Sequence, residues 1–101
     1  MPLKVKKVDY DVDLVDGLIV ELDIGYTPRV TVIEVYVKAT DVIDVYVEGS
    51  AAKDKWHVAD VAEGVTEFHA GYINVTPYVR LRVPPASGVK CDYLICVGTL
   101  S

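Results

Sequence analysis

The sequence predicts an all-β protein, a single antiparallel β-sandwich of the jelly-roll type. Its 101 residues include 20 valines, 6 isoleucines and 7 tyrosines but no glutamine, and β-branched and aromatic side chains favour strands over helices. Apolar and polar residues alternate with a period of two along several segments, which is the pattern of a half-buried strand. These segments recur about every ten residues between Gly, Pro and Asp turns, as in sandwiches and barrels.

Length and charge limit the possible functions. The chain suits one domain covering residues 1–101. Ten Lys and Arg against 15 Asp and Glu argue against a nucleic acid partner. The apolar run at residues 93–97 is far shorter than the roughly 20 residues that span a bilayer. We also find no signal peptide. We therefore expect no membrane insertion and a cytoplasmic or virion-associated protein, and the near absence of Asn and Gln suits a thermophilic source.

The first two strands are expected to pair as a hairpin. Both alternate strictly, and their apolar positions are Val8, Tyr10, Val12 and Leu14, then Leu18, Val20, Leu22 and Ile24. A three-residue loop with Gly17 in the left-handed conformation places these two rows opposite each other on one apolar face. A change of phase at Lys6 and Lys7 predicts a β-bulge or a bend between sheets there.

Residues 32–38 and 42–48 resemble each other and predict two strands joined at residues 39–41. Their inward side chains would be Ile33, Val35, Val37, Ile43, Val45 and Val47, and their outward side chains Glu34, Tyr36, Lys38, Asp44, Tyr46 and Glu48.

The later strands are shorter in this interpretation. A strand begins at Trp56, residues 59–64 could hold one helical turn, and two short strands follow, broken at Gly71. Residues 78–83 place Val79, Leu81 and Val83 inward and Tyr78, Arg80 and Arg82 outward. The last strand, residues 89–97, is apolar on both faces near its end and is expected to be central.

No catalytic or metal-binding motif stands out, so we expect no enzymatic activity, no cofactor and no metal site. Cys91 and Cys96 lie five apart in one strand, on opposite faces and about 16 Å from each other, too far for a disulfide. His57 and His69 have no acid or nucleophile at a recognisable spacing.

An acidic face follows from the expected hairpin. Its members are Asp9, Asp11, Asp13, Glu21 and Asp23, with Asp9 opposite Asp23 and Asp11 opposite Glu21. Such a face could be simply solvated, dock a basic protein, or bind a divalent cation.

Outward tyrosines and arginines form a second candidate surface, with Tyr36, Tyr46, Tyr78, Arg80 and Arg82. Both residue types are enriched at protein interfaces, although they also make ordinary cross-strand pairs.

Candidate ligand loops lie at residues 25–29, 49–55 and 84–88, and Ser50, Lys53 and Trp56 are the candidate ligand-binding residues near the second loop. Trp56 could be a core anchor or a platform on which a sugar stacks.

Three segments together resemble a known family. Residues 45–50 (Val-Tyr-Val-Glu-Gly-Ser), Trp56 and residues 78–83 (Tyr-Val-Arg-Leu-Arg-Val) look like the core of discoidin-like, or galactose-binding-like, jelly-roll domains. The resemblance covers residues 42–97, and no sugar- or calcium-binding residue of the family maps onto a position here. It implies a non-enzymatic module that binds carbohydrate, lipid or protein through loops, of a kind also found on phage and viral particles.

Two hypotheses follow. The chain is a structural module that packs with copies of itself or a larger particle such as a virion or surface appendage, or it is a carbohydrate-binding module that uses the loops near Trp56.

Overall fold

The computed structural model describes residues 4–25 and 31–99. Six strands make up the fold: β1 (Lys4–Asp13), β2 (Leu18–Asp23), β3 (Thr31–Ser50), β4 (His57–Asn74), β5 (Tyr78–Val83) and β6 (Lys90–Thr99). All pairings are antiparallel, and within the described ranges no helix occurs. The all-β prediction is confirmed.

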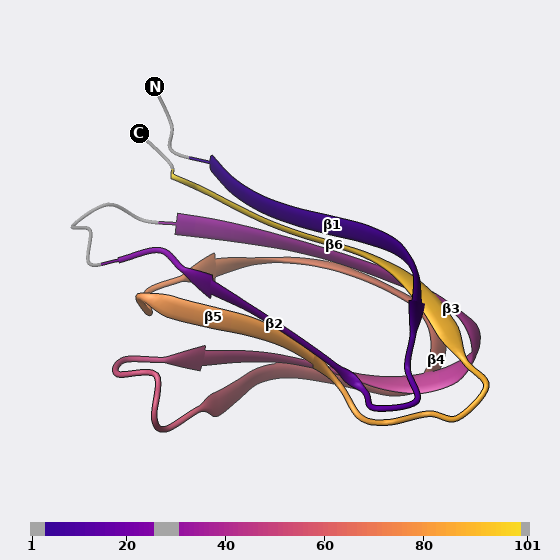
Figure 1. The fold of residues 1–101 in the computed structure, drawn as a ribbon. Coiled ribbons are helices and arrows are strands. Elements are labelled where there is room, and N and C mark those ends of the chain that lie inside the picture. Colours follow the sequence, from indigo (N-terminus) through magenta and orange to yellow (C-terminus); the bar gives the residue numbers. More distant parts are fainter. Residues whose placement is uncertain (1–3, 26–30, 100–101) are drawn as a thin grey trace.

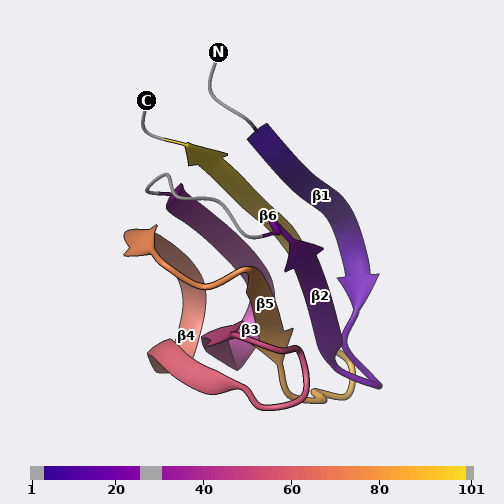
Figure 2. The same cartoon turned by 90° about the vertical axis from the view of Figure 1, so that its left-hand side faces the viewer.

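One continuous sheet holds all six strands, in the order β1-β6-β3-β5-β2 with β4 also paired to β3. The first part of β3 pairs with β6 and its last part with β5, while β4 follows β3 along its length. The sheet therefore curls into a half-barrel (Figures 1 and 2). We call its two parts the β6 half (β1, β6 and the adjoining parts of β3 and β4) and the β5 half (β2, β5 and the other parts of β3 and β4). Two separate sheets of a jelly roll are not seen in these pairings.

The strand β3 is longer than expected. Residues 39–41 continue it instead of turning. A tight hairpin loop of two or three residues needs a residue with positive φ, and none lies there. Register shifts between Lys38 and Val45 take up the bend. Opposite the bend, Gly64 has a φ of 66°, and its N–H donates to Asp44 Oδ1 at 2.9 Å.

The inward rows of the chain form the core between the two halves. Its buried members are Leu14, Val20, Leu22, Ile33, Val35, Val37, Ile43, Val45, Val47, Val79, Leu81, Val83, Val89, Cys91, Ile95 and Val97. The inward rows expected on residues 33–37, 43–47 and 79–83 are thus confirmed. Cys91 and Cys96 are both free, and β6 is central, between β1 and β3.

The inward row expected on β1 is wrong in part. Val8 and Tyr10 are 42% and 68% exposed, because the bulge lies between Asp9 and Val12 and not at Lys6 and Lys7. Asp11 has a φ of 53° there. The bulge changes the phase, so that Val12 packs against the core while Val8 and Tyr10 do not.

The expected β1–β2 hairpin is also wrong. β1 pairs with β6 and β2 with β5, because the turn after β1 is tied to the β5–β6 connection. Leu14 is fully buried; its N–H donates to Val89 O at 2.9 Å and its carbonyl accepts from Ala86 N at 2.7 Å. Gly17 does have the expected positive φ of 78°, and a Cβ there would lie 2.8 Å from Val83 O.

Strand β4 replaces several expected elements. Residues 59–64 are strand, not a helical turn, and Gly71 does not interrupt the strand. Pairing with β3 explains both, since residues 60–62 pair with residues 45–47 and Gly71 pairs with Glu34, which satisfies backbone groups of β4 on both sides of the bend. The Tyr72 hydroxyl donates to Asp60 Oδ2 at 2.7 Å, linking two distant parts of this strand. Burial, and then that carboxylate, raise the pKa of Tyr72.

Candidate interaction surface

The outer surface of the β5 half gathers most of the candidate residues. We define the β5 face by the side chains of Ile19, Glu21, Tyr46, Glu48, Trp56, Val58, Val61, Tyr78, Arg80 and Arg82. Cross-strand register aligns them in rows: Arg82 lies between Ile19 and Tyr46, and Arg80 between Glu21 and Glu48. Outward alternation on β5, opposite its buried Val79, Leu81 and Val83, places both arginines here.

Glu48 is the centre of the face and is only 4% exposed. Its Oε1 accepts from Arg80 Nε at 2.7 Å and from Arg82 Nε at 3.0 Å, and Arg82 Nη2 lies 3.5 Å from Oε2. Burial raises the pKa of Glu48, but the hydrogen bonds and charges of the two arginines outweigh it, so the net pKa lies below its ordinary value. One carboxylate therefore fixes two guanidinium groups.

Each arginine also stacks on an aromatic ring. Arg80 Cζ lies 4.3 Å from the centroid of Trp56, and Arg82 Cζ lies 4.2 Å from that of Tyr46. These distances are those of cation–π contacts. We call the resulting sequence Trp56, Arg80, Glu48, Arg82 and Tyr46 the arginine–aromatic row. Trp56 is partly buried in it and is not a member of the core.

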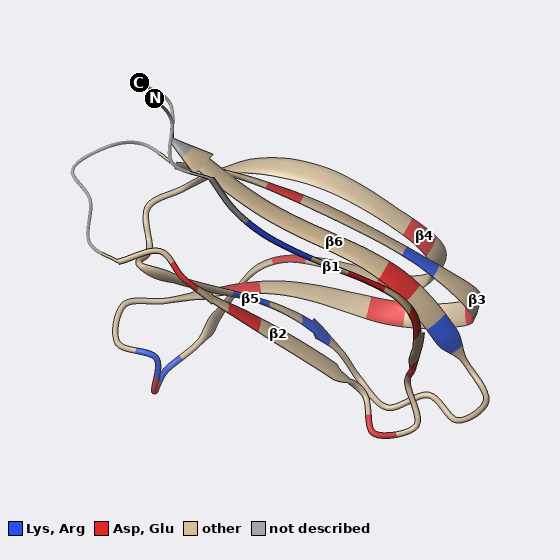
Figure 3. Ribbon diagram, turned by 45° about the horizontal axis from the view of Figure 1, so that its top comes forward, with Lys and Arg blue, Asp and Glu red and all other residues tan. Residues whose placement is uncertain are grey.

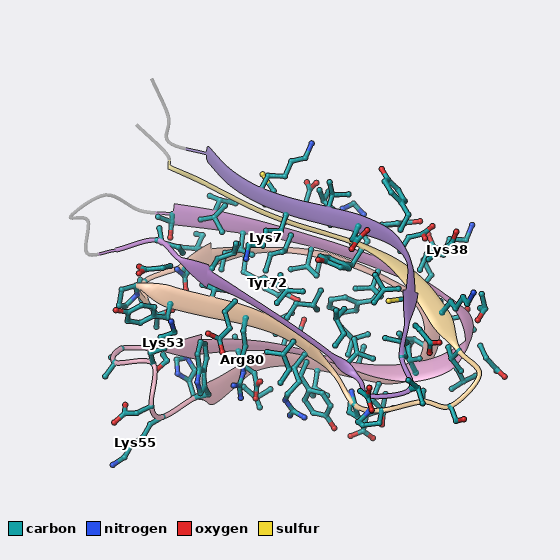
Figure 4. All side chains as sticks on the ribbon, viewed as in Figure 1. Lys7, Lys38, Lys53, Lys55, Tyr72 and Arg80 are labelled. Atoms are coloured by element: carbon teal, nitrogen blue, oxygen red, sulfur yellow. The ribbon has the colours of Figure 1, made fainter. Side chains whose placement is uncertain are left out.

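The loop before Trp56 is built by Ser50. This buried hydroxyl donates to Lys55 O at 2.6 Å and accepts from Lys53 N at 2.9 Å. Gly49 is needed beside it, because a Cβ there would lie 2.8 Å from Thr76 Oγ1. Ser50 is thus structural, while Lys53 is exposed and its Nζ lies 3.9 Å from Glu21 Oε2. Figure 4 shows Lys53 and Arg80 at the same end of the molecule.

Exposed aliphatic side chains border the arginine–aromatic row. Ile19, Val58 and Val61 are 61%, 49% and 44% exposed, and register places Val61 beside Tyr46 and Val58 beside Glu48. The β5 face thus combines ordered aromatic and guanidinium groups with apolar surface.

Tyr36 is separated from the other interface candidates. It lies on the outer surface of the β6 half, between Leu94 and His69 in register. Its ring meets His69 edge-on at 5.9 Å, and its hydroxyl donates to Glu67 at 3.3 Å. A groove of about 350 Å³ lies beside it, lined by Lys6, Val8, Tyr10, Tyr36, Asp92, Tyr93 and Leu94. We call this surface the β6 face.

The expected acidic face is not assembled. Asp9 lies opposite Tyr93, Glu21 opposite Arg80 and Asp23 opposite Tyr78, so the carboxylates of β1 and β2 are not cross-strand neighbours. Opposite charges across a strand pair are favourable and like charges are not. Asp11 and Asp13 stay exposed on β1, and Asp13 Oδ1 accepts from Val15 N at 3.0 Å.

Other candidate chemistry is sparse in the described part of the chain. His57 and His69 are exposed, and no group of three or more His, Cys, Asp and Glu in residues 4–25 and 31–99 could hold a metal ion. Burial, and then the charge of Asp92, raise the pKa of the Cys91 thiol to about 11.

No helix of the described residues is long and apolar enough to span a membrane. Of the loop candidate at residues 25–29, residues 26–29 lie outside the described ranges.

Sequence reasoning missed the role of Glu48, which was expected to be an outward surface residue. The sequence feature that could have indicated this role is a pair of arginines two residues apart, Arg80 and Arg82, on a strand that has no carboxylate of its own. Recognising the acid that they share requires knowing that β5 lies beside β3.

Comparisons with known proteins identify the fold. No family model and no curated protein matches this chain. Among solved structures, the PBSX exported protein XepA aligns with a TM-score of 0.65 at 9% identity, over 94% of this chain and 36% of XepA. The SPBc2 prophage-derived protein YomS aligns with a TM-score of 0.60 at 12% identity, over 96% of this chain and 95% of YomS. The chain therefore spans about a third of XepA and nearly all of YomS, and shares their fold.

Proposed function

We propose that this chain is a non-enzymatic structural module that packs with copies of itself or with a larger particle of the virion or surface-appendage type. The β5 face is the proposed contact surface. The observation that supports this most directly is the arginine–aromatic row, in which Glu48 and two aromatic rings hold both arginines.

Preorganisation makes such a row suitable for binding. Ordering a flexible side chain at an interface costs about 0.5–1.5 kcal/mol, and here Arg80 and Arg82 are already held by ion pairs in the free chain. Trp, Tyr and Arg are also the residues that contribute most to binding energy at interfaces. The exposed Ile19 and Val61 supply apolar area beside them.

The fold comparison supports a phage-related setting. YomS is prophage-derived by its name and matches this chain over nearly its full length. The two halves of the curled sheet pack against one core, as the two layers of a β-sandwich do. We therefore propose that the module is equivalent to a β-sandwich in its packing. Fold likeness alone does not determine function, so the proposal depends mainly on the β5 face.

Sedimentation velocity of the full chain over a concentration series tests the proposal. We expect reversible association of the wild type, weakened at least about tenfold by the Ile19→Lys substitution, because a charge placed in an apolar contact must be desolvated. Val75→Lys is the matched control, since Val75 is 90% exposed and is not part of the β5 face.

A wild type that stays monomeric at high concentration, and that is also not captured by virions or appendages of its source, contradicts the proposal. Equal effects of the Ile19→Lys and Val75→Lys substitutions contradict the choice of surface.

A carbohydrate-binding module remains the second candidate, favoured by the position of Trp56 beside the exposed loop at residues 51–55 and by the discoidin-like resemblance. Arg80 stacks on one face of the ring, so a sugar would have to stack on the other. Binding on a glycan array that is lost in Trp56→Ala, while the circular dichroism spectrum is unchanged, would support this candidate; an array without binding would reject it.

A further inference from the structure

Strand β1 forms one edge of the curled sheet. Among the residues that the structure describes, it pairs only with β6, and Figure 2 shows it at the outer rim of the sheet. An edge strand presents unpaired N–H and C=O groups to which another strand can add.

The charges on β1 are divided along its length. Lys6 and Lys7 precede Asp9 and Asp11, and all four side chains are exposed. Figure 3 shows a blue segment followed by red segments along β1. A second copy of β1 aligned antiparallel reverses this order, so that the lysines of each copy meet the aspartates of the other. The strand is therefore complementary to itself in charge.

The bulge makes this pairing consistent in register as well. Tyr10 and Asp11 together occupy the position opposite Asp92 on β6, as the two residues of a β-bulge do. Counted as one position, they make Val8 the midpoint of residues 6–11. A twofold axis at Val8 then places Lys7 opposite Asp9 of the second copy, and Lys6 opposite its Tyr10 and Asp11. Each pair lies on one face of the sheet, as antiparallel pairing requires.

The same pairing covers exposed apolar surface. Val8 is 42% and Tyr10 68% exposed, and both line the groove of the β6 face. At the twofold axis the two Val8 side chains meet, and the two grooves adjoin.

The other long edge is less suited to self-pairing. Residues 57–74 of β4 contain Asp60, Glu63 and Glu67 but no Lys or Arg, so two copies of β4 would bring carboxylates together. The remaining edge strand, β2, has only 6 residues.

We propose that β1 is a homodimerisation edge at which two copies join antiparallel about a twofold axis through Val8. This inference rests on the proposed assembly function and names a second copy of the chain as one partner. The joined β6 halves form one sheet across the dimer, and each β5 face stays free for other contacts.

Charge exchange at one pair tests the proposal. Lys7→Asp places two aspartates opposite each other in the homodimer, and Asp9→Lys places two lysines there. A mixture of the two variants restores opposite charges at both symmetry-related pairs. Lys55→Asp and Asp54→Lys make the same charge changes in an exposed loop, and Figure 4 shows Lys55 at the lower left of the molecule, away from Lys7.

Sedimentation velocity over a concentration series gives the result. We expect wild-type species of twice 11.1 kDa or larger, a dissociation constant raised at least about tenfold in each single variant, and recovery to within about threefold of the wild type in the mixture. The loop variants should dimerise as the wild type does.

A wild type that does not dimerise, or a mixture that associates no better than either variant alone, overturns the proposal. If Ile19→Lys abolishes association while Lys7→Asp and Asp9→Lys leave it unchanged, the β1 edge is rejected and the proposed function through the β5 face stands. The converse result supports the edge and rejects the face.

Discussion

The β5 and β6 faces have the same strand architecture beneath them but differ in how their outer side chains are held. On the β5 face, Glu48 is 4% exposed and binds two arginines. On the β6 face, Glu34 occupies an outward position on the same strand and is exposed. Both faces cover inward rows of buried valine and isoleucine.

This difference separates two sources of stability. The inward rows exclude water from both halves in the same way. Among the described residues, outer side chains add buried polar contacts on the β5 face alone, because Trp56 and Tyr46 stack on the arginines that surround Glu48. Substitutions at equivalent outward positions should therefore have unequal effects on the two faces.

The largest difference is expected between Glu48→Gln and Glu34→Gln. Loss of the Glu48 charge leaves Arg80 and Arg82 side by side with no carboxylate between them, and should lower the free energy of unfolding by about 2 kcal/mol. Glu34→Gln should change it by less than about 0.5 kcal/mol. Urea denaturation followed by circular dichroism measures both.

An equal loss in the free energy of unfolding in the two variants would mean that Glu48, with its ion pairs, stabilises the fold no more than the exposed carboxylate of Glu34 does. The two faces would then be equivalent in stability, despite their different geometry.

The pH dependence of stability sharpens the same comparison. The folded state holds the pKa of Glu48 below its ordinary value of 4.5, so the unfolded chain binds more protons as the pH falls. The stabilisation is complete above pH 4.5 and is lost as the pH falls through the folded-state pKa. The free energy of unfolding should therefore fall more steeply as the pH is lowered below 4.5 in the wild type than in Glu48→Gln. Parallel curves would contradict this.

Much of the interior was predictable from the sequence. Alternation alone identifies Val35, Val45 and Leu81 as inward, since strand geometry fixes which side chains share a face. Which strand pairs with which was not predictable, because the apolar row of one strand can lie beside the apolar row of any other strand equally well. The rows of β1 and β2 match in a hairpin, yet contacts of Leu14 with the β5–β6 turn direct the two strands to different neighbours.

The candidate site was predictable only in composition. Tyr46, Arg80 and Arg82 were recognised as outward from their strand phase, but the acid that orders the arginines lies 32 residues before Arg80. Trp56 was assigned to a core or a sugar platform, because its stacking partner depends on the position of β5.

A smaller effect is expected from Arg80→Lys. Lysine keeps the charge but loses the flat guanidinium group that stacks on Trp56, and should lower the free energy of unfolding by about 1 kcal/mol. Since the chain has one tryptophan, its fluorescence emission should shift to longer wavelength as the ring gains water contact. Arg82→Lys is the control, because Arg82 stacks on Tyr46; a shift of the same size in that variant would argue against the Trp56 stack.

The smallest effect comes from a pair of tyrosines that the sequence cannot tell apart. Tyr36 and Tyr46 each lie in a Val-Tyr-Val segment of β3, but only Tyr46 has an arginine over its ring. Tyr46→Leu should therefore cost about 0.5 kcal/mol more stability than Tyr36→Leu, the value of a partly exposed cation–π contact. The difference should vanish when both substitutions are repeated in an Arg82→Ala background, since that change removes the stacked guanidinium. A difference that persists there would trace to packing of the two rings and not to Arg82.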